Sequence, residues 1–219
     1  HSQCPNRARH RILPWRPSPE KGDLSVYHHP MPLLQILTVS TRPGRKGPAV
    51  AAWFEYQARQ HDKFAIETVD LAELRLPLFD EPEHPRLRKY QHEHTKGWSA
   101  QVDRADAFVF VTPEYNFATP PSLVNALDYL SLEWAYKPVG FVSYGGASGG
   151  LRSVQMTKQI VTALKMMPMA EGVSIPFVAR LIDAETGILD PGAPQAKAAA
   201  VMLDEILRWA EALRVLRVG

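Results

Sequence analysis

From Leu33 onward, short runs of apolar and β-branched residues alternate with longer segments whose apolar residues recur every three or four positions. The short runs predict strands buried on both faces of a sheet, and the longer segments predict helices. This alternation predicts a parallel sheet covered by helices on both sides. The predicted strands are Leu33–Val39, Phe64–Leu71, Ala107–Thr112, Val139–Tyr144 and Met169–Ile175.

Helical segments separate these five strands along the chain. Five strands favour the flavodoxin-like strand order 2-1-3-4-5, because the alternative Rossmann order requires six. The predicted fold class is therefore α/β, a three-layer sandwich around a five-stranded parallel sheet. The predicted helices are Pro48–His61, Leu87–Ala105, Ser122–Leu132, Leu151–Met166 and Ala193–Val215.

Residues 1–30 differ in composition from the rest of the chain. They contain five prolines, five basic residues and two acidic residues, and they show neither helical nor strand periodicity. We predict a disordered tail or an upstream extension here, followed by a single flavodoxin-like domain at residues 31–219.

The overall composition, with 45% hydrophobic and 22% charged residues, is typical of a soluble globular protein. The tail accounts for the formal net charge of +2, so we predict no nucleic-acid partner. No apolar run approaches the ~20 residues that cross a bilayer, and the lone Cys4 excludes an intrachain disulfide. These features predict a cytoplasmic protein with no membrane partner.

Three loops with unusual chemistry follow the first, third and fourth predicted strands. They are Ser40–Gly47, Pro113–Pro121 and Ser143–Gly150. The carboxyl ends of parallel strands meet at one edge of the sheet, and open α/β sheets bind their ligands there. We therefore expect the three loops to form one site.

The first of these loops predicts a phosphate site. Its sequence, Ser-Thr-Arg-Pro-Gly-Arg-Lys-Gly, places hydroxyls and cations around two glycines directly before a helix. Backbone N–H groups at a helix N-terminus attract an anion, and arginines add contacts to phosphate oxygens. The spacing of a P-loop or of a dinucleotide fingerprint is absent, which favours the terminal phosphate of a mononucleotide.

The other two loops predict a site for a flat heterocycle. The second loop begins with Pro113-Glu114-Tyr115-Asn116 and so offers an acid, an aromatic ring and an amide. The third has four glycines among the six residues 145–150, which leave backbone amides open to a planar ring.

Together, the three loops resemble those of the NAD(P)H-dependent FMN reductase family of flavodoxin-like proteins. The similarity spans residues 34–164, and Val39 stands where the family usually has glycine. The motifs that carry it, in chain order, are Ser40-Thr41-Arg42-Pro43-Gly44-Arg45, Pro113-Glu114-Tyr115-Asn116, and Lys137-Pro138-Val139 followed by Ser143-Tyr144-Gly145-Gly146.

The resemblance implies FMN as the cofactor and NAD(P)H as a substrate. It also implies that the chemistry takes place at N5 of the flavin, so no catalytic side chain is expected. The FMN phosphate would lie on the first loop, and the isoalloxazine ring between the other two. The implied cofactor-binding residues are Ser40, Arg42, Arg45, Lys46, Gly47, Pro113, Glu114, Tyr115, Asn116, Ser143, Tyr144, Gly145 and Gly146.

The implied function is an FMN-dependent NAD(P)H oxidoreductase. It would pass hydride, in ping-pong turnover, to a small-molecule electron acceptor such as a quinone, an azo compound or free flavin. The alternative is a flavin-binding electron carrier or redox-responsive partner protein that does not turn over NAD(P)H.

The resemblance further implies a homodimer or homotetramer. An apolar face after Pro121 is one candidate for the subunit interface, and packing of this face against its own sheet is the alternative. Its residues are Leu123, Leu127, Leu130 and Trp134.

No metal site is predicted. His92 and His94 lie two positions apart and would point to different sides of a helix, which does not suit a shared metal ion. Exposed histidines are the simpler interpretation.

Overall fold

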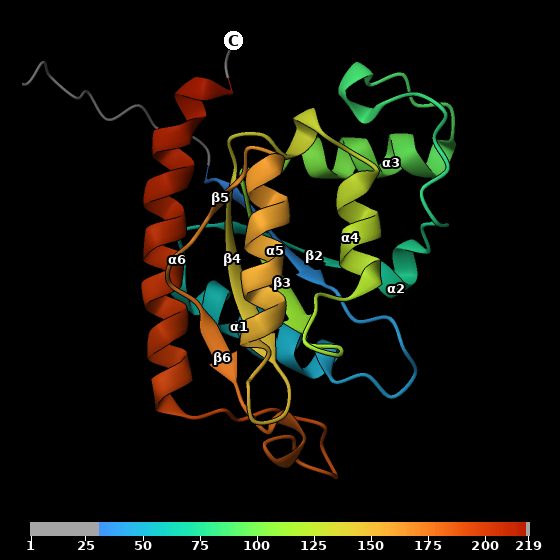
Figure 1. Ribbon diagram of the computed structural model, residues 1–219. Helices are drawn as coiled ribbons and strands as arrows, with labels where there is room; N and C mark the ends of the chain where they lie inside the picture. Colours follow the sequence, from blue (N-terminus) through green and yellow to red (C-terminus); the bar gives the residue numbers. More distant parts are fainter. Residues whose placement is uncertain (1–30, 218–219) are drawn as a thin grey trace, which may run out of the picture. The chain divides into compact units, whose positions relative to one another are not determined.

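The computed structural model describes residues 31–217, which form a sheet with helices on both faces (Figure 1). The strands are parallel and follow the order β2-β1-β3-β4-β5, with β6 also paired to β4. This order confirms the predicted flavodoxin-like topology. The strands are β1 Leu33–Thr38, β2 Ala65–Asp70, β3 Ala107–Pro113, β4 Pro138–Tyr144, β5 Met167–Pro168 and β6 Val173–Ile175.

The fifth position of the sheet holds two short strands, so the prediction of one strand over Met169–Ile175 was wrong in its bounds. β5 pairs with the start of β4, and β6 pairs with its end. Pro168 has no amide hydrogen to donate, and a proline in this position interrupts the ladder.

The helices form separate layers on the two faces of the sheet (Figure 1). On one face, Phe54 of α1 and Met202 of α6 belong to a buried cluster with residues of β1 and β3. On the other face, Trp98 of α3 and Leu127 of α4 belong to a second cluster, which α5 joins. The helices are α1 Gly47–His61, α2 Leu71–Leu74, α3 Glu93–Asp103, α4 Pro121–Asp128, α5 Leu151–Ala163 and α6 Ala193–Leu213.

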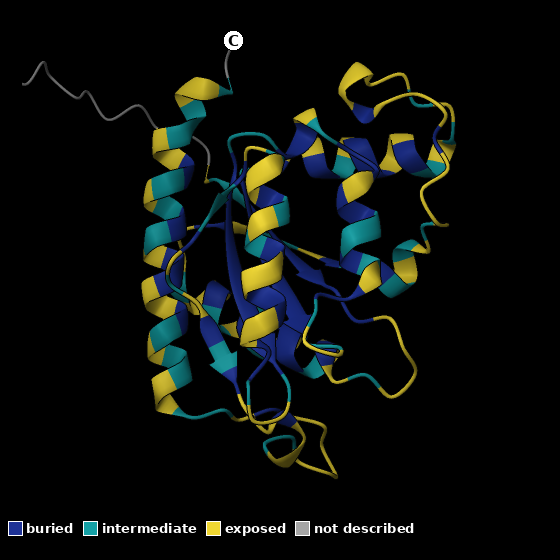
Figure 2. Cartoon of the chain, viewed as in Figure 1, coloured by how far each residue is buried: buried dark blue, intermediate teal, exposed yellow. Residues whose placement is uncertain are grey.

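The central strands β3 and β4 are buried along their whole length, whereas the helices expose the sides that face away from the sheet (Figure 2). Burial on both faces explains why each of these strands is a continuous apolar run in the sequence. The fold therefore fixes the carboxyl ends of β1, β3 and β4 at one edge.

The predicted helix over residues 87–105 begins only at the start of α3. Arg88, with a left-handed φ of +50°, ends a short 3₁₀ turn just before it. The carboxylate of Glu81 then accepts hydrogen bonds from the amides of Gln91 and His92. These contacts hold the intervening residues outside the helix.

Other helix bounds also differ from the prediction. α4 and α5 end four and three residues early, and Lys165 just after α5 has a left-handed φ of +60°. The short helix α2 was not predicted. It begins after Asp70, whose carboxylate accepts a hydrogen bond from the Ala72 amide at 2.9 Å.

Lys137 of the Lys-Pro-Val motif joins α3 to β4. Its side chain is buried, and its Nζ donates to the carbonyls of Val102 and Asp103 at 2.8 and 2.9 Å. These carbonyls belong to the last turn of α3, so the lysine satisfies groups that the helix leaves unpaired. Burial lowers the pKa of Lys137 to about 8. The motif thus has a structural role at the start of β4. This is the opposite end of the strand from the three predicted ligand-binding loops.

Within residues 31–217, no helix combines the length and the apolar character needed to cross a membrane. The predicted tail, residues 1–30, lies outside the described residues. The division of the chain into a tail and one FMN-binding domain therefore stays a prediction.

Replacing Gly97 with alanine is expected to stabilise the fold by about 0.5–1 kcal/mol. Gly97 is an exposed residue inside α3, and a Cβ at this position would meet no atom within 4 Å. Alanine thus lowers the conformational entropy of the unfolded chain without a clash in the folded one. Urea unfolding followed by circular dichroism measures the change, and a less stable variant would contradict the expectation.

Candidate functional site

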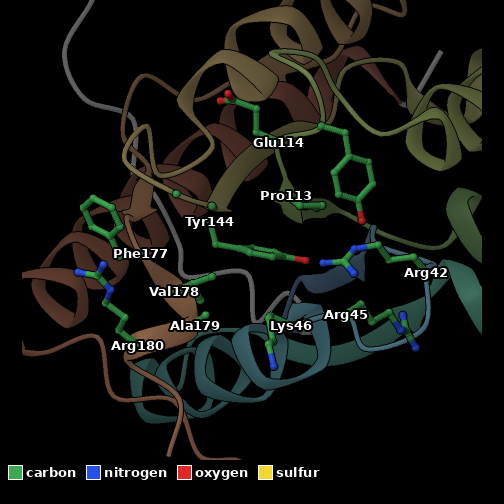
Figure 3. A pocket seen from close by; sticks show the side chains of 13 residues that line it. Arg42, Arg45, Lys46, Pro113, Glu114, Tyr144, Phe177, Val178, Ala179 and Arg180 are labelled. Carbon is green, nitrogen blue, oxygen red and sulfur yellow. The ribbon is translucent and has the colours of Figure 1, made fainter.

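A cavity of about 410 Å³ lies at the carboxyl edge of the sheet, between the three predicted loops (Figure 3). Small-molecule sites typically have volumes of about 300–1,000 Å³. The sheet topology has therefore brought the three loops together around a space of suitable size. Nine of the predicted cofactor-binding residues line it: Arg42, Arg45, Lys46, Pro113, Glu114, Tyr115, Tyr144, Gly145 and Gly146.

The other four predicted residues do not line the cavity. Ser40 and Gly47 lie beside Tyr144, because a Cβ built on Gly47 would overlap Ser40 Oγ and lie 2.9 Å from Tyr144 Oη. Ser143 is buried, and its hydroxyl donates to a carbonyl of β6 at 3.5 Å. Asn116 is exposed in a turn.

The N-terminus of α1 is uncapped at one end of this cavity. Among the described residues, no acidic side chain lies in its first turn, and the cap residue Lys46 makes no side-chain hydrogen bond to it. The helix has 15 residues, so its free N–H groups coincide with the positive end of a well-developed dipole. Such a helix end attracts an anion.

Two buried hydroxyls beside this helix end have no hydrogen-bond partner within residues 31–217. They belong to Ser40, which is 1% exposed, and to Tyr144, which is 4% exposed. Burial raises the pKa of Tyr144 to about 12, so this hydroxyl keeps its proton at neutral pH and can donate it to an acceptor. A buried polar group without a partner costs about 1–3 kcal/mol, so the pair fits a ligand that accepts hydrogen bonds here.

Arg42 and Arg45 have different environments, although the resemblance assigns both to the phosphate. The two Nη atoms of Arg45 pair with both carboxylate oxygens of Asp70 at 2.6 Å, and one of them donates to the Ser40 carbonyl at 2.6 Å. Arg42 and Lys46 are exposed, and neither has an ion-pair partner in the part of the chain that the structure describes. Figure 3 shows Arg42 reaching toward Tyr144, whereas Arg45 points away. Arg45 thus fixes the first loop, and Arg42 is available to an anion.

The carboxylate of Glu114 is directed away from Tyr144 and the cavity (Figure 3). It accepts hydrogen bonds from Ser148 Oγ at 3.0 Å, from the Arg152 amide at 3.1 Å and from Arg152 Nε at 2.6 Å. Burial raises the pKa of Glu114, but the hydrogen bonds from Arg152 and Ser148 outweigh this effect and lower the pKa below its usual value. Glu114 therefore joins the second loop to the third loop and to the start of α5.

The second loop turns back on itself between Tyr115 and Ala118. The Tyr115 amide donates to the Ala118 carbonyl at 3.1 Å, and the reverse bond measures 2.9 Å. The two residues at the tip, Asn116 and Phe117, have φ values of +50° and +68°. Asparagine tolerates this conformation well, so Asn116 suits the turn, and its predicted contact with a flavin stays a prediction.

The glycines of the third loop serve different purposes. Gly150 is needed by the fold, because its φ is +83° and a Cβ there would lie 2.8 Å from the Tyr144 amide nitrogen. A Cβ on Gly146 would meet no atom within 4 Å, so the surrounding protein does not require glycine at this cavity position. The expectation of free amides was wrong for three of the four glycines: Gly145 donates to the Ile175 carbonyl at 3.2 Å, Gly149 to the Gly146 carbonyl at 3.1 Å, and Gly150 to Ser148 Oγ at 3.4 Å. The Gly146 amide, in contrast, has no acceptor within residues 31–217.

One wall of the cavity, the segment that follows β6, was missed at the level of sequence. The amide of Phe177 donates to the Gly146 carbonyl at 3.0 Å, and that of Val178 donates to the Gly145 carbonyl at 3.2 Å. The rule that ligands bind at the carboxyl ends of parallel strands applies to β6 as well and would have indicated this wall. Its lining residues are Phe177, Val178, Ala179 and Arg180.

The apolar face considered for a subunit interface is buried within the chain itself. Its four side chains belong to the cluster that α3 and α4 form with the sheet. The alternative, packing against the chain's own sheet, is thus observed. The exposed fractions are 0% for Leu123, Leu127 and Trp134, and 1% for Leu130.

His92 and His94 lie side by side, contrary to the expectation from helical spacing. Their rings stack with centroids 5.1 Å apart, because His92 is the cap residue that precedes α3 and does not belong to the helix. Among residues 31–217, no group of three or more His, Cys, Asp or Glu side chains is arranged to hold a metal ion.

The profile of a family described as NADPH-dependent FMN reductase matches residues 32–179. An NAD(P)H-dependent FMN reductase of Schizosaccharomyces pombe is 41% identical over 137 residues, which are 62% of this chain and 68% of the relative. A second NAD(P)H-dependent FMN reductase, from a Nectria species, is 33% identical over 155 residues, which are 68% of this chain and 77% of that relative.

Among solved structures, a flavoenzyme NAD(P)H:(acceptor) oxidoreductase from Paracoccus denitrificans has a similar fold. It superposes with a TM-score of 0.62 and covers 83% of this chain and 98% of its own. The sequences are 20% identical, so this likeness is one of fold.

Proposed function

The chain belongs to the NADPH-dependent FMN reductase family, and from this premise we propose how its cavity works. It is an oxidoreductase with FMN as its cofactor and NAD(P)H as its substrate. We propose that it passes hydride from NAD(P)H through FMN to a quinone, an azo compound, free flavin or a similar small acceptor. The observation that carries the proposal is the pair of buried, unpartnered hydroxyls of Ser40 and Tyr144 beside the N-terminus of α1.

The FMN phosphate would lie at this end of the cavity. Ser40 and Tyr144 would donate hydrogen bonds to it, the first turn of α1 would offer its free amides, and Arg42 and Lys46 would supply positive charge. The flat ring would extend between the second and third loops. When bound, FMN supplies the ring that accepts a hydride and passes its electrons on.

The chain's own side chains would bind and orient, with no acid or base among them. Glu114 is the carboxylate in the lining, and Ser148 and Arg152 already occupy its oxygens. The raised pKa of Tyr144 keeps its hydroxyl a donor at neutral pH. The Gly146 amide is available to donate to the polar edge of the ring, where a preformed donor stabilises developing negative charge.

Both substrates would use the same cavity in turn. NAD(P)H and the acceptor would approach the same exposed face of the ring, so we expect ping-pong kinetics. Double-reciprocal plots at several quinone concentrations should give parallel lines, and intersecting lines would argue against a shared site.

Replacing Arg42 with glutamine is expected to weaken FMN binding about tenfold, because a charge-assisted hydrogen bond contributes about 1.5–3 kcal/mol. Quenching of flavin fluorescence measures the Kd. Arg59, exposed on α1 and paired with Glu55, provides the matched control R59Q, which should leave the Kd unchanged. An R42Q protein that binds FMN as tightly as the wild type would remove Arg42 from the phosphate site.

The function as a whole is tested by mixing FMN-loaded protein with NADPH and a neutral quinone. NADPH consumption that requires both FMN and quinone supports the reductase. Flavin that stays bound but is not reduced by NADPH supports the alternative, an electron carrier, and rejects the reductase.

We also propose that the protein is cytoplasmic and that it assembles into a homodimer or a homotetramer. The buried face of α4 cannot form the subunit contact, so another surface would have to do so. Sedimentation equilibrium measures the assembly, and a monomer at micromolar concentration would exclude it.

A further inference from the structure

The cavity has a second cationic end. Arg42 and Lys46 lie at the end beside α1, and Arg180 lies at the opposite end (Figure 3). Arg180 is exposed, and its guanidinium lies over the ring of Phe177 at 4.9 Å from the centroid. No carboxylate in the part of the chain that the structure describes pairs with it. This cation differs in that respect from Arg45, which pairs with Asp70.

The position of Arg180 is fixed by the segment that carries it. Phe177 adopts a left-handed φ of +51°, a strained conformation for an aromatic residue. Its amide donates to the Gly146 carbonyl, and the Arg180 amide donates to the Phe177 carbonyl at 2.9 Å. The backbone of this segment is therefore fixed beside the third loop, and the Phe177 ring supports the exposed guanidinium at this end of the cavity.

At the Arg180 end of the cavity, no lining carboxylate among the described residues is available to neutralise the arginine. Glu114 is the carboxylate of the lining, and Arg152 neutralises it. One mononucleotide carries one phosphate group, which the end beside α1 would bind. An anionic group that binds at the Arg180 end would then belong to a second ligand.

We propose that Arg180 binds a phosphate group of the nicotinamide nucleotide that donates the hydride. The inference rests on the proposed function, in which this nucleotide is the substrate common to every acceptor and always carries phosphate groups. Arg180 acts here as a specificity-determining residue, with Phe177 supporting its guanidinium.

Isothermal titration of FMN-loaded protein with the oxidised nucleotides NADP⁺ and NAD⁺ tests this binding without turnover. The variants are R180Q and R180K, with R208Q as the matched control, because Arg208 is exposed on α6 and pairs with Glu205. R180Q is expected to weaken NADP⁺ about tenfold, R180K less, and R208Q not at all. The KM for NADPH, measured with a neutral quinone, should rise in parallel while kcat and FMN content stay unchanged.

If R180Q weakens the binding of NADP⁺ alone, the 2′-phosphate is the partner of Arg180. If it weakens NADP⁺ and NAD⁺ equally, the diphosphate is the partner. Both results support the proposal. Wild-type protein that binds neither nucleotide overturns it, as does an R180Q protein with unchanged affinities. Loss of FMN from R180Q also overturns it, because Arg180 would then hold the flavin. Nucleotide binding that depends on Arg180, without NADPH oxidation by the wild type, would reject the proposed function but would still support the contact between Arg180 and a nucleotide phosphate.

Discussion

Replacing Gly47 with alanine is expected to weaken FMN binding at least a hundredfold. The new Cβ would overlap Ser40 Oγ and lie 2.9 Å from Tyr144 Oη and 3.0 Å from a methyl group of Thr38. All three neighbours are buried, so the hydroxyls must move away from the position in which they would meet the phosphate. Two hydrogen bonds to a charged group contribute about 1.5–3 kcal/mol each, so their loss exceeds the ~2.7 kcal/mol of a hundredfold change.

The same substitution is expected to lower the free energy of unfolding by about 1–3 kcal/mol, the usual cost of overpacking. The double variant S40A/G47A separates the two effects. Removal of the Ser40 hydroxyl relieves the closest overlap and should restore part of the lost stability, but it should not restore FMN binding. G97A is the control for a glycine-to-alanine change elsewhere. Tight FMN binding by G47A would show that the phosphate does not lie at this end of the cavity.

Replacing Glu114 with alanine should lower the free energy of unfolding by about 2 kcal/mol and weaken FMN binding at least tenfold. The Glu114 side chain is 7% exposed, and it joins both loops that would enclose the flavin ring. Its removal leaves Ser148 Oγ and the Arg152 amide without their acceptor. The stability cost stays below that of a fully buried ion pair, because half of the Arg152 side chain is exposed and can be hydrated.

The pH dependence of E114Q provides a second measurement. The pKa of Glu114 is lowered in the folded state, so its contribution to stability is present at neutral pH and is lost as pH falls below its usual value of 4.5. The difference in unfolding free energy between wild type and E114Q should therefore be constant near pH 7 and shrink in acid. The control E93Q neutralises an exposed carboxylate in the first turn of α3 that pairs with Lys96; it should lower the free energy of unfolding by no more than about 1 kcal/mol and leave FMN affinity unchanged. A difference in unfolding free energy between wild type and E114Q that does not change with pH would contradict a charged pair between Glu114 and Arg152.

The sheet and its ligand-binding edge were predictable, because their signals are local. β3 and β4 are buried on both faces, so each appears as a continuous apolar run with turn residues after it. The strand order places the loops after β1, β3 and β4 at one edge. The same logic applied to the predicted strand that ends at Ile175 would have included Arg180, because β6 ends at that same residue.

The partners of the charged residues were not predictable from local patterns. Arg45 pairs with Asp70, 25 positions away, and Glu114 pairs with Arg152, 38 positions away. Both residues lie in loops with ligand-binding motifs, so the sequence favoured direct contact with the cofactor. Only the folded arrangement shows that Arg45 and Glu114 hold the loops in place, whereas Arg42 remains free of such an ion pair among the described residues.

In the function proposed here, the first loop and the N-terminus of α1 bind the phosphate of a single FMN. The most direct test of this phosphate site compares the Kd values of FMN and riboflavin for the wild-type protein, since the two flavins differ only in that phosphate. The contacts available from Ser40, Tyr144 and Arg42 predict that FMN binds at least a hundredfold more tightly. Equal affinities for the two flavins would contradict the claim.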